Sequence, residues 1–265
     1  MTIWFRALRR VRLIICSLIC MYFVDSVNAQ VNTEAMRAEA VSEGIINSLG
    51  VEFGFEKSDQ EVLDVAAKYR IDYFNPGGLH VFFVLNYENG YEKEHGETKN
   101  QIVNKGFGHI RLTKDISSNL FFEVFTQFGY NDFLSMKDRR LAGSGLRYRM
   151  LEGDKMDAFI GIGAMQENEI YDLQSEAAKR LIRSTNYIRW NITISENARL
   201  NNTAYYQLAS SDMADYRLLY DGGLEFEIGE KLYFTVELNY RYDNDPHGNL
   251  GKSYVEINNG IEFNF

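Results

Sequence analysis

The chain has 265 residues, with 28 Lys and Arg against 37 Asp and Glu, which gives a formal net charge of −9. This acidic balance argues against a nucleic-acid-binding protein and against a polybasic segment that would hold an anionic membrane surface. Hydrophobic residues make up 45% of the sequence and charged residues 25%, a mixture that fits alternating strands better than long apolar runs.

One long apolar run lies near the beginning of the chain. It occupies residues 13–24, follows four arginines and precedes small residues that end at Ala29. A basic head, a short apolar centre and small residues before a cut are typical of a secretory signal peptide, and the run is too short for a membrane helix. We therefore expect cleavage after Ala29. The expected organisation is a signal peptide at 1–29, a short periplasmic segment at 30–43 and an outer-membrane β-barrel at 44–265.

The predicted cleavage removes both cysteines of the chain. Cys16 and Cys20 lie inside the signal segment, and neither follows the small residue that a lipoprotein acceptor would need. We therefore expect a mature protein without a lipid anchor and without disulfides. Its balance would be 24 Lys and Arg against 36 Asp and Glu, or −12.

From Gly44 to the end, apolar and polar side chains alternate with the period of a β-strand. The expected strands are 44–56, 61–73, 79–91, 101–113, 119–131, 139–150, 156–167, 181–194, 198–209, 215–228, 231–243 and 252–265. Each is long enough for the roughly 9–11 residues of a tilted membrane strand. Short and longer connections also alternate, as periplasmic turns and outer loops do. The sequence therefore predicts an all-β fold, a closed antiparallel transmembrane β-barrel of about 12 strands.

The last predicted strand shows the alternation most clearly. Phe263 and Phe265 share one face with Ile261, while Glu262 and Asn264 lie on the other. A chain with this pattern that stops on an aromatic residue resembles the closing strand of an outer-membrane barrel, whose apolar side meets lipid. A soluble periplasmic barrel that binds a ligand is the alternative, and it would turn the apolar side inward.

Aromatic residues gather near both ends of the predicted strands, as two interfacial belts would. The predicted girdle comprises Tyr130, Tyr240 and Tyr242 near the outer ends and Tyr148, Trp190, Phe263 and Phe265 near the periplasmic ends.

The inward positions carry many charges. The predicted lumen charges include Glu123, Arg147, Arg149, Arg189, Glu237 and Arg241. They allow two interpretations. Opposite charges can pair into a cross-linked plug, so that none is buried alone; alternatively, they can form a pathway that sorts small solutes. We expect outer-membrane lipid and the barrel assembly machinery as partners, small ions or solutes as further ones, and no nucleic acid.

Neither a catalytic motif nor a cofactor site is apparent. The histidines are His80, His95, His109 and His247, and no Gly-x-Ser-x-Gly elbow accompanies them. We expect no enzyme and no cofactor, and a barrel lipid hydrolase stays as an alternative because catalytic triads are spatial. The loop at 243–249 crowds oxygen ligands but lacks the spacing of an EF-hand, so we interpret it as a turn and expect no metal.

Four blocks of the sequence carry a resemblance to a known family. They are NKGFGHIRL at 104–112, YNDF at 130–133, RLAGSGLRYR at 140–149 and YRYDNDP at 240–246, the last followed by Lys252 and the aromatic terminus. The chain resembles the salt-induced outer-membrane proteins similar to YdiY, a family of unknown function numbered 481. Where many members have a second proline after the last block, this chain has His247.

The resemblance implies an outer-membrane barrel and brings no established substrate or catalytic residue. Its matched cations are Arg140, Arg147, Arg149 and Arg241, for which we expect a functional or packing role. The sequence thus predicts an exported outer-membrane barrel that is either structural or a narrow channel for small solutes.

Overall fold

A computed structural model describes residues 44–57, 60–94, 98–173, 178–247 and 251–265. The predicted signal peptide and periplasmic segment lie outside the described residues. The strands are β1 (Gly44–Lys57), β2 (Gln60–Asn75), β3 (Leu79–Glu94), β4 (Asn100–Asp115), β5 (Leu120–Asn131), β6 (Met136–Leu151), β7 (Met156–Tyr171), β8 (Ala178–Ser184), β9 (Asn186–Ser195), β10 (Ala198–Leu208), β11 (Tyr216–Gly229), β12 (Leu232–Asp243) and β13 (Ser253–Asn264). A single 3-10 turn, η1 (Asp132–Leu134), joins β5 to β6 in this part of the chain. No helix of the described ranges is long and apolar enough to cross a membrane.

The strands form one closed antiparallel sheet. Strands that follow one another in the sequence pair with one another, and β1 pairs with β13 to close the sheet. β8 and β9 together form one barrel strand. Gly161 pairs with Tyr187 of β9 and Ala164 pairs with Ser184 of β8, so the register against β7 continues through Thr185. The described residues therefore form a barrel of twelve strands, as predicted.

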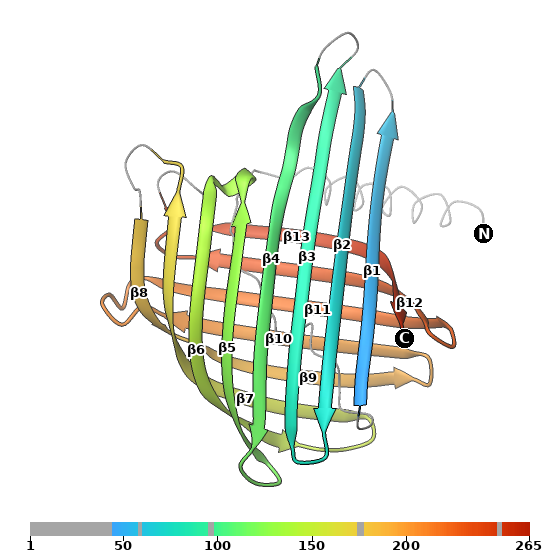
Figure 1. The fold of residues 1–265 in the computed structure, drawn as a ribbon, viewed down its shortest axis with the longest axis vertical. Coiled ribbons are helices and arrows are strands. Elements are labelled where there is room, and N and C mark those ends of the chain that lie inside the picture. The colour runs from blue at the N-terminus through green and yellow to red at the C-terminus, as the bar shows by residue number, and fades with distance from the viewer. Residues whose placement is uncertain (1–43, 58–59, 95–97, 174–177, 248–250) are drawn as a thin grey trace, which may run out of the picture.

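Figure 1 shows how the strands lie in the barrel. β1 to β6 cross steeply in front of β9 to β13, as tilted strands on opposite walls of a barrel do. One end, here called the turn end, carries the short connections, such as the one between β2 and β3. The other end, the loop end, carries the longer connections, apart from the short one between β1 and β2, and β1 to β4 rise beyond the other strands there (Figure 1).

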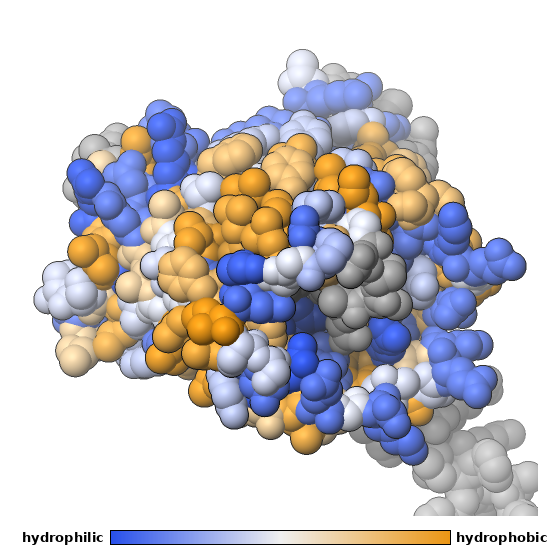
Figure 2. All heavy atoms as spheres, turned by 60° about the horizontal axis from the view of Figure 1, so that its bottom comes forward, coloured by the Kyte–Doolittle hydropathy of each residue, from blue (hydrophilic) through white to orange (hydrophobic). Residues whose placement is uncertain are grey.

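Side chains alternate between the lumen and the outer surface. Ile162 and Phe128 face outward and are each 58% exposed, whereas Arg183 of the lumen is fully buried. Figure 2 shows broad hydrophobic areas over the barrel surface, in orange, with hydrophilic side chains between and beside them. Because the charges lie inside and the apolar side chains outside, the arrangement is the reverse of that expected for a soluble barrel.

The barrel closes along a short ladder between β1 and β13, here called the seam. The paired residues of the seam are Ser48–Val51 on β1 and Ile261–Asn264 on β13. Asn47 and Phe265 extend it by two backbone hydrogen bonds of 2.9 and 3.0 Å. By contrast, β1 pairs with β2 along its whole length, from Gly44 to Lys57. The seam thus covers the turn end of β1 and leaves its loop-end half without pairing to β13 in the described residues.

Candidate functional site in the barrel lumen

Glu123 is the centre of a buried cluster in the turn-end half of the lumen. The hydroxyl of Tyr187 donates to its Oε2 at 2.9 Å, and that of Thr113 donates to its Oε1 at 3.2 Å. The guanidinium groups of Arg111 and Arg147 lie 3.5 and 3.9 Å from the carboxylate. This one carboxylate therefore joins β4, β5, β6 and β9 across the lumen.

The other predicted turn-end cations also lie inside the barrel. The guanidinium of Arg147 lies 3.8 Å from the centroid of the Phe159 ring, a favourable cation–π distance. Arg189 donates from Nε to Oδ1 of Asn191 at 3.3 Å and is buried. Arg149 lies at the rim, where it pairs with Glu152 at 2.9 Å and is 27% exposed.

The alternation of the strands did not predict a set of buried apolar side chains inside the barrel, here called the apolar layer. It consists of three clusters: Phe82, Val84 and Phe107; Phe125, Leu141 and Met165; and Tyr187, Tyr205 and Leu219. A signal was present in the sequence, because adjacent apolar residues such as Val124 and Phe125 place one apolar side chain on each face of a strand. The prediction of a polar interior is therefore incomplete, because apolar side chains also lie inside the barrel.

Glycines on β6 and β7 make room for the rings of this layer. A methyl group at position 161 would overlap the ring of Tyr187, and one at position 143 would lie 2.6 Å from Phe125. Glycine in a strand often marks such a close approach. Gly143 and Gly161 thus leave room for the ring of the residue that pairs with each of them on the adjacent strand.

A buried ionic network, here called the outer network, occupies the loop-end half of β6, β7, β8, β11 and β12. Arg217 donates from Nε to Asp243 at 2.8 Å, from Nη1 to Glu167 at 3.0 Å and from Nη2 to Glu169 at 3.2 Å. Arg139 contacts the same two glutamates, at 2.5 and 3.1 Å. Because each charge has partners of opposite sign, the desolvation cost of burying it is offset.

Asp215, in the connection before β11, extends the outer network. Its Oδ1 accepts a 2.8 Å hydrogen bond from Arg183, and its Oδ2 lies 2.9 Å from Nζ of Lys179. Burial alone would raise the pKa of Asp215, but the bonds from Arg183 and Lys179 outweigh it and lower this pKa below its ordinary value. The carboxylate is therefore held in its charged form.

His247, the residue that departs from the resembling family, also joins the outer network. Its Nε2 lies 3.2 Å from Oε2 of Glu169, and its ring stacks on Tyr171 with centroids 3.9 Å apart. His80 pairs with Asp72 at 2.7 Å at the turn end, and His109 is buried. His95 lies outside the described residues. Among those described, no group of three or more His, Cys, Asp or Glu is placed to hold a metal ion.

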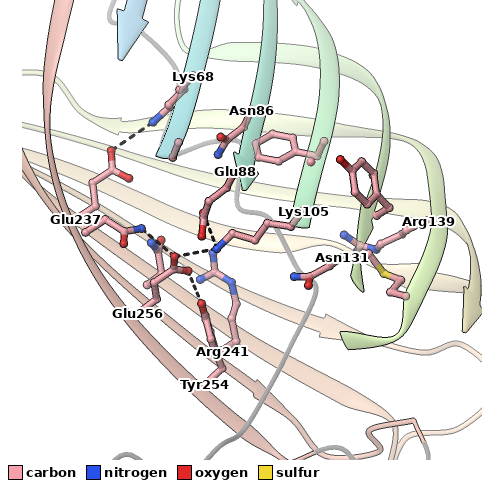
Figure 3. A pocket seen from close by; sticks show the side chains of 18 of the residues that line it. Lys68, Asn86, Glu88, Lys105, Asn131, Arg139, Glu237, Arg241, Tyr254 and Glu256 are labelled. Atoms are coloured by element: carbon pink, nitrogen blue, oxygen red, sulfur yellow. Dashed lines mark hydrogen bonds and ion pairs between the residues drawn. The ribbon is translucent and has the colours of Figure 1, made fainter. Parts of the chain in front are cut away.

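A cavity of about 120 Å³ remains beside these packed layers (Figure 3). Nζ of Lys105 lies 2.8 Å from Glu88 and 3.0 Å from Glu256, and the hydroxyl of Tyr254 donates to Glu256 at 2.6 Å. These ion-paired side chains are between 13% and 25% exposed, so solvent reaches them. The residues that line the cavity come from β1 to β6 and from β12 and β13.

Two predicted lumen charges line this cavity. Glu237 pairs with Lys68 at 3.3 Å. Arg241 pairs with Asp221 at 2.7 Å and also donates to the carbonyl of Tyr220 at 3.1 Å. The structure thus brings Glu237 and Arg241 together at the cavity, whereas Glu123, Arg147, Arg149 and Arg189 lie in the turn-end half.

Of the predicted girdle residues, Tyr148, Tyr240, Phe263 and Phe265 are exposed on the outside of the barrel, and Tyr130, Trp190 and Tyr242 are half-buried. Tyr130, Tyr240 and Tyr242 lie toward the loop end, and Tyr148, Trp190, Phe263 and Phe265 lie toward the turn end. The ring of Tyr242 is 5.9 Å from that of Tyr216, and the rings of Phe263 and Phe265 are 5.6 Å apart. Their role as interfacial anchors stays a prediction.

A family model described as "Protein of unknown function, DUF481" matches residues 58–265. The chain belongs to the DUF481 family. The resemblance drawn from the sequence blocks is therefore confirmed. No curated protein matches this chain.

Solved outer-membrane barrels are similar to this DUF481 chain in fold. An outer membrane channel from Pseudomonas putida F1 is 10% identical, with a TM-score of 0.54 over 86% of this chain and 97% of that one. The translocator domain of the autotransporter NalP from Neisseria meningitidis is 10% identical, with a TM-score of 0.46 over 83% and 87%. The KdgM porin in complex with disordered oligogalacturonate is 10% identical, with a TM-score of 0.45 over 83% and 99%. At this identity the likeness is one of fold.

Proposed function

We propose that the protein is an exported outer-membrane barrel with a narrow lumen through which small ions or solutes cross. The exposed apolar wall supports a membrane location, because a barrel in lipid needs such a band. Paired strands also satisfy their backbone polar groups without water. We place the turn end in the periplasm and the loop end outside, with outer-membrane lipid and the barrel assembly machinery as partners.

The cavity beside Lys105 is the observation that carries the channel proposal. Charged side chains from β2, β3, β4, β12 and β13 converge on it and remain partly exposed, although the barrel wall encloses them. Buried charges that serve only to join strands need no solvent-filled space around them. A passage for hydrated ions does need it.

A closed structural barrel is the second candidate. The Glu123 cluster, the apolar layer and the outer network fill most of the section between β5 and β11, and they support it. A channel must therefore run off-centre, along the wall that carries the cavity. We propose no catalytic role, since the described histidines lie inside the barrel and are at most 8% exposed, whereas a barrel lipid hydrolase would present one to lipid.

Planar-bilayer recording tests the proposal. The full-length chain would be expressed, purified from the outer-membrane fraction in detergent and shown to be folded by heat-modifiable migration. Discrete conductance steps are expected from the channel. Folded protein that gives no steps would contradict the channel and favour the structural barrel, and absence from the membrane fraction would contradict the location.

A further inference from the structure

A second cavity continues the first one toward the turn end. It has a volume of about 40 Å³, and Asn201, Glu225 and Thr235 are among its lining residues. Both cavities are lined by Lys68, Glu237 and Asn239. They therefore meet at these side chains and together form one off-centre space, here called the passage, on the side of the barrel that carries the seam.

The ion pair between Lys68 and Glu237 interrupts the passage where the two cavities meet. Lys68 is on β2 and Glu237 on β12, and β1 and β13 lie between these strands. The two side chains meet across this span at 3.3 Å, and they are 19% and 33% exposed. An ion pair whose charges keep some contact with solvent is held less firmly than a fully buried one, because water competes for both charges. The pair can thus close the passage without making it a permanent wall.

Carboxylates outnumber cations along the passage. Its described lining includes Glu52, Glu88, Asp221, Glu225, Glu237 and Glu256 against Lys68, Lys105, Arg139 and Arg241. Arg139 is bound by the glutamates of the outer network, and Arg241 is bound by Asp221. Five carboxylates therefore face two lysines. Low-dielectric walls lined by one sign of charge concentrate ions of the opposite sign.

Glu52 adds a carboxyl group that makes no direct contact with a cation among the described residues. It lines the first cavity, and among the described residues it makes no hydrogen bond or ion pair. Its side chain lies over Gly260, where an added methyl group would be 2.8 Å from Cγ of Glu52. The glycine on β13 thus leaves space for Glu52 to extend into the passage, close to the Lys68–Glu237 pair.

We propose that the passage selects small cations and that the Lys68–Glu237 ion pair is its gate. This inference rests on the proposed channel function. A cation entering from the loop end meets the carboxylates around Lys105, then displaces Lys68 from Glu237 and passes between Glu237 and Glu52. Anions meet a net negative lining along the same path. The selected class is small monovalent or divalent metal cations, since the first cavity holds about 120 Å³.

Reversal potentials in a potassium chloride gradient test the selectivity. The full-length protein from the membrane fraction would be compared with Glu237→Gln, Lys68→Gln and a control, Lys137→Gln, whose side chain is 60% exposed at the loop end. We expect the wild type to prefer potassium over chloride several-fold. Glu237→Gln should move the ratio toward chloride, Lys68→Gln should raise both conductance and potassium preference, and Lys137→Gln should change neither.

Each outcome decides one claim. Conductance without potassium preference would overturn the cation selectivity and leave the proposed channel standing. Folded protein without conductance would overturn both. Unchanged ratios and conductances in the Lys68 and Glu237 variants would overturn the gate. If a single variant fails to fold, the double variant Lys68→Glu with Glu237→Lys takes its place, because it keeps an ion pair between these two positions. Wild-type conductance from this double variant supports the gate, and a permanently larger conductance contradicts it.

Discussion

Val51 of β1 lies opposite Ile261 of β13, and this pair ends the backbone ladder that closes the barrel. Beyond it, the loop-end half of β1 continues to pair with β2, and the corresponding half of β13 continues to pair with β12. One edge of each strand therefore has no backbone partner in the described residues. The side-chain bridge from Lys68 to Glu237 crosses this seam from inside the lumen.

Amide hydrogen exchange should report the end of the seam. In the register of the seam, the amide of Phe53 points toward β13 and that of Ile257 points toward β1, beyond the last pair. We expect both amides to exchange faster than those of Val51 and Ile261, because exchange needs no opening of a backbone hydrogen bond. Protection of Phe53 and Ile257 equal to that of Val51 and Ile261 would show that the ladder continues.

Arg217 should be the residue on which the outer network depends most. It contacts Glu167, Glu169 and Asp243 at once, and the Arg217→Met variant would leave these buried carboxylates short of positive charge. We expect a loss of about 3–5 kcal/mol in unfolding free energy, as for a broken buried ion pair. Urea unfolding in lipid vesicles, followed by heat-modifiable migration, measures it.

Arg140→Met is the matched control for Arg217→Met. Arg140 is 73% exposed and pairs with Asp138 at 3.0 Å. An exposed ion pair contributes roughly 0–1 kcal/mol, so the control should unfold almost like the wild type. Equal losses in the two variants would contradict the central position of Arg217. The same comparison of unfolding free energies shows that Arg140, one of the positions that match the family, contributes less to stability than the buried cations.

The strands could be predicted from the sequence because each needs only local alternation. The expected strands 79–91 and 231–243 correspond to β3 and β12, and the differences are at the ends. The seam could not be predicted in this way. Its length depends on the register between Val51 and Ile261, which no local pattern encodes.

The candidate site was only partly predictable. Alternation identified Glu237 and Arg241 as inward charges, and both line the passage. It gave no indication that Lys68 would meet Glu237, because this contact crosses two intervening strands. The apolar layer was not predicted for a different reason. A strand with apolar residues on both faces, such as β5, shows a weaker alternation of apolar and polar residues.

Gly161 should tolerate no side chain. The ring of Tyr187 occupies the position of a methyl group there, and its hydroxyl donates a 2.9 Å hydrogen bond to Glu123. Gly161→Ala would displace the ring and weaken that bond, at an expected cost of about 1–3 kcal/mol in unfolding free energy. Gly223→Ala is the control, since nothing lies within 4 Å of a methyl group at position 223. A variant at Gly161 as stable as the one at Gly223 would contradict this packing.

Asp215 should make part of the stability depend on pH. Its pKa is lowered in the folded state, because Arg183 and Lys179 outweigh the effect of burial. The stabilisation is therefore present above the ordinary carboxyl pKa of about 4 and is lost as the pH falls through the lower folded value. Asp215→Asn should be less stable than the wild type at neutral pH, and the difference in unfolding free energy should shrink on acidification. A difference that is independent of pH would contradict the ionic role.

Arg241 and Arg147 should differ in their effect on conduction, although both are buried inward cations. Arg241 lines the first cavity and neutralises Asp221 at 2.7 Å, whereas Arg147 lies in the turn-end cluster against Phe159. Arg241→Gln frees one more carboxylate beside the passage, so the preference for potassium over chloride should rise in bilayer recordings. Arg147→Gln should lower the unfolding free energy by leaving Glu123 with less positive charge, while the preference of the folded protein stays unchanged. If the potassium preference instead changed in the Arg147 variant and not in the Arg241 variant, the conducting path would lie at the Glu123 cluster and not along the seam.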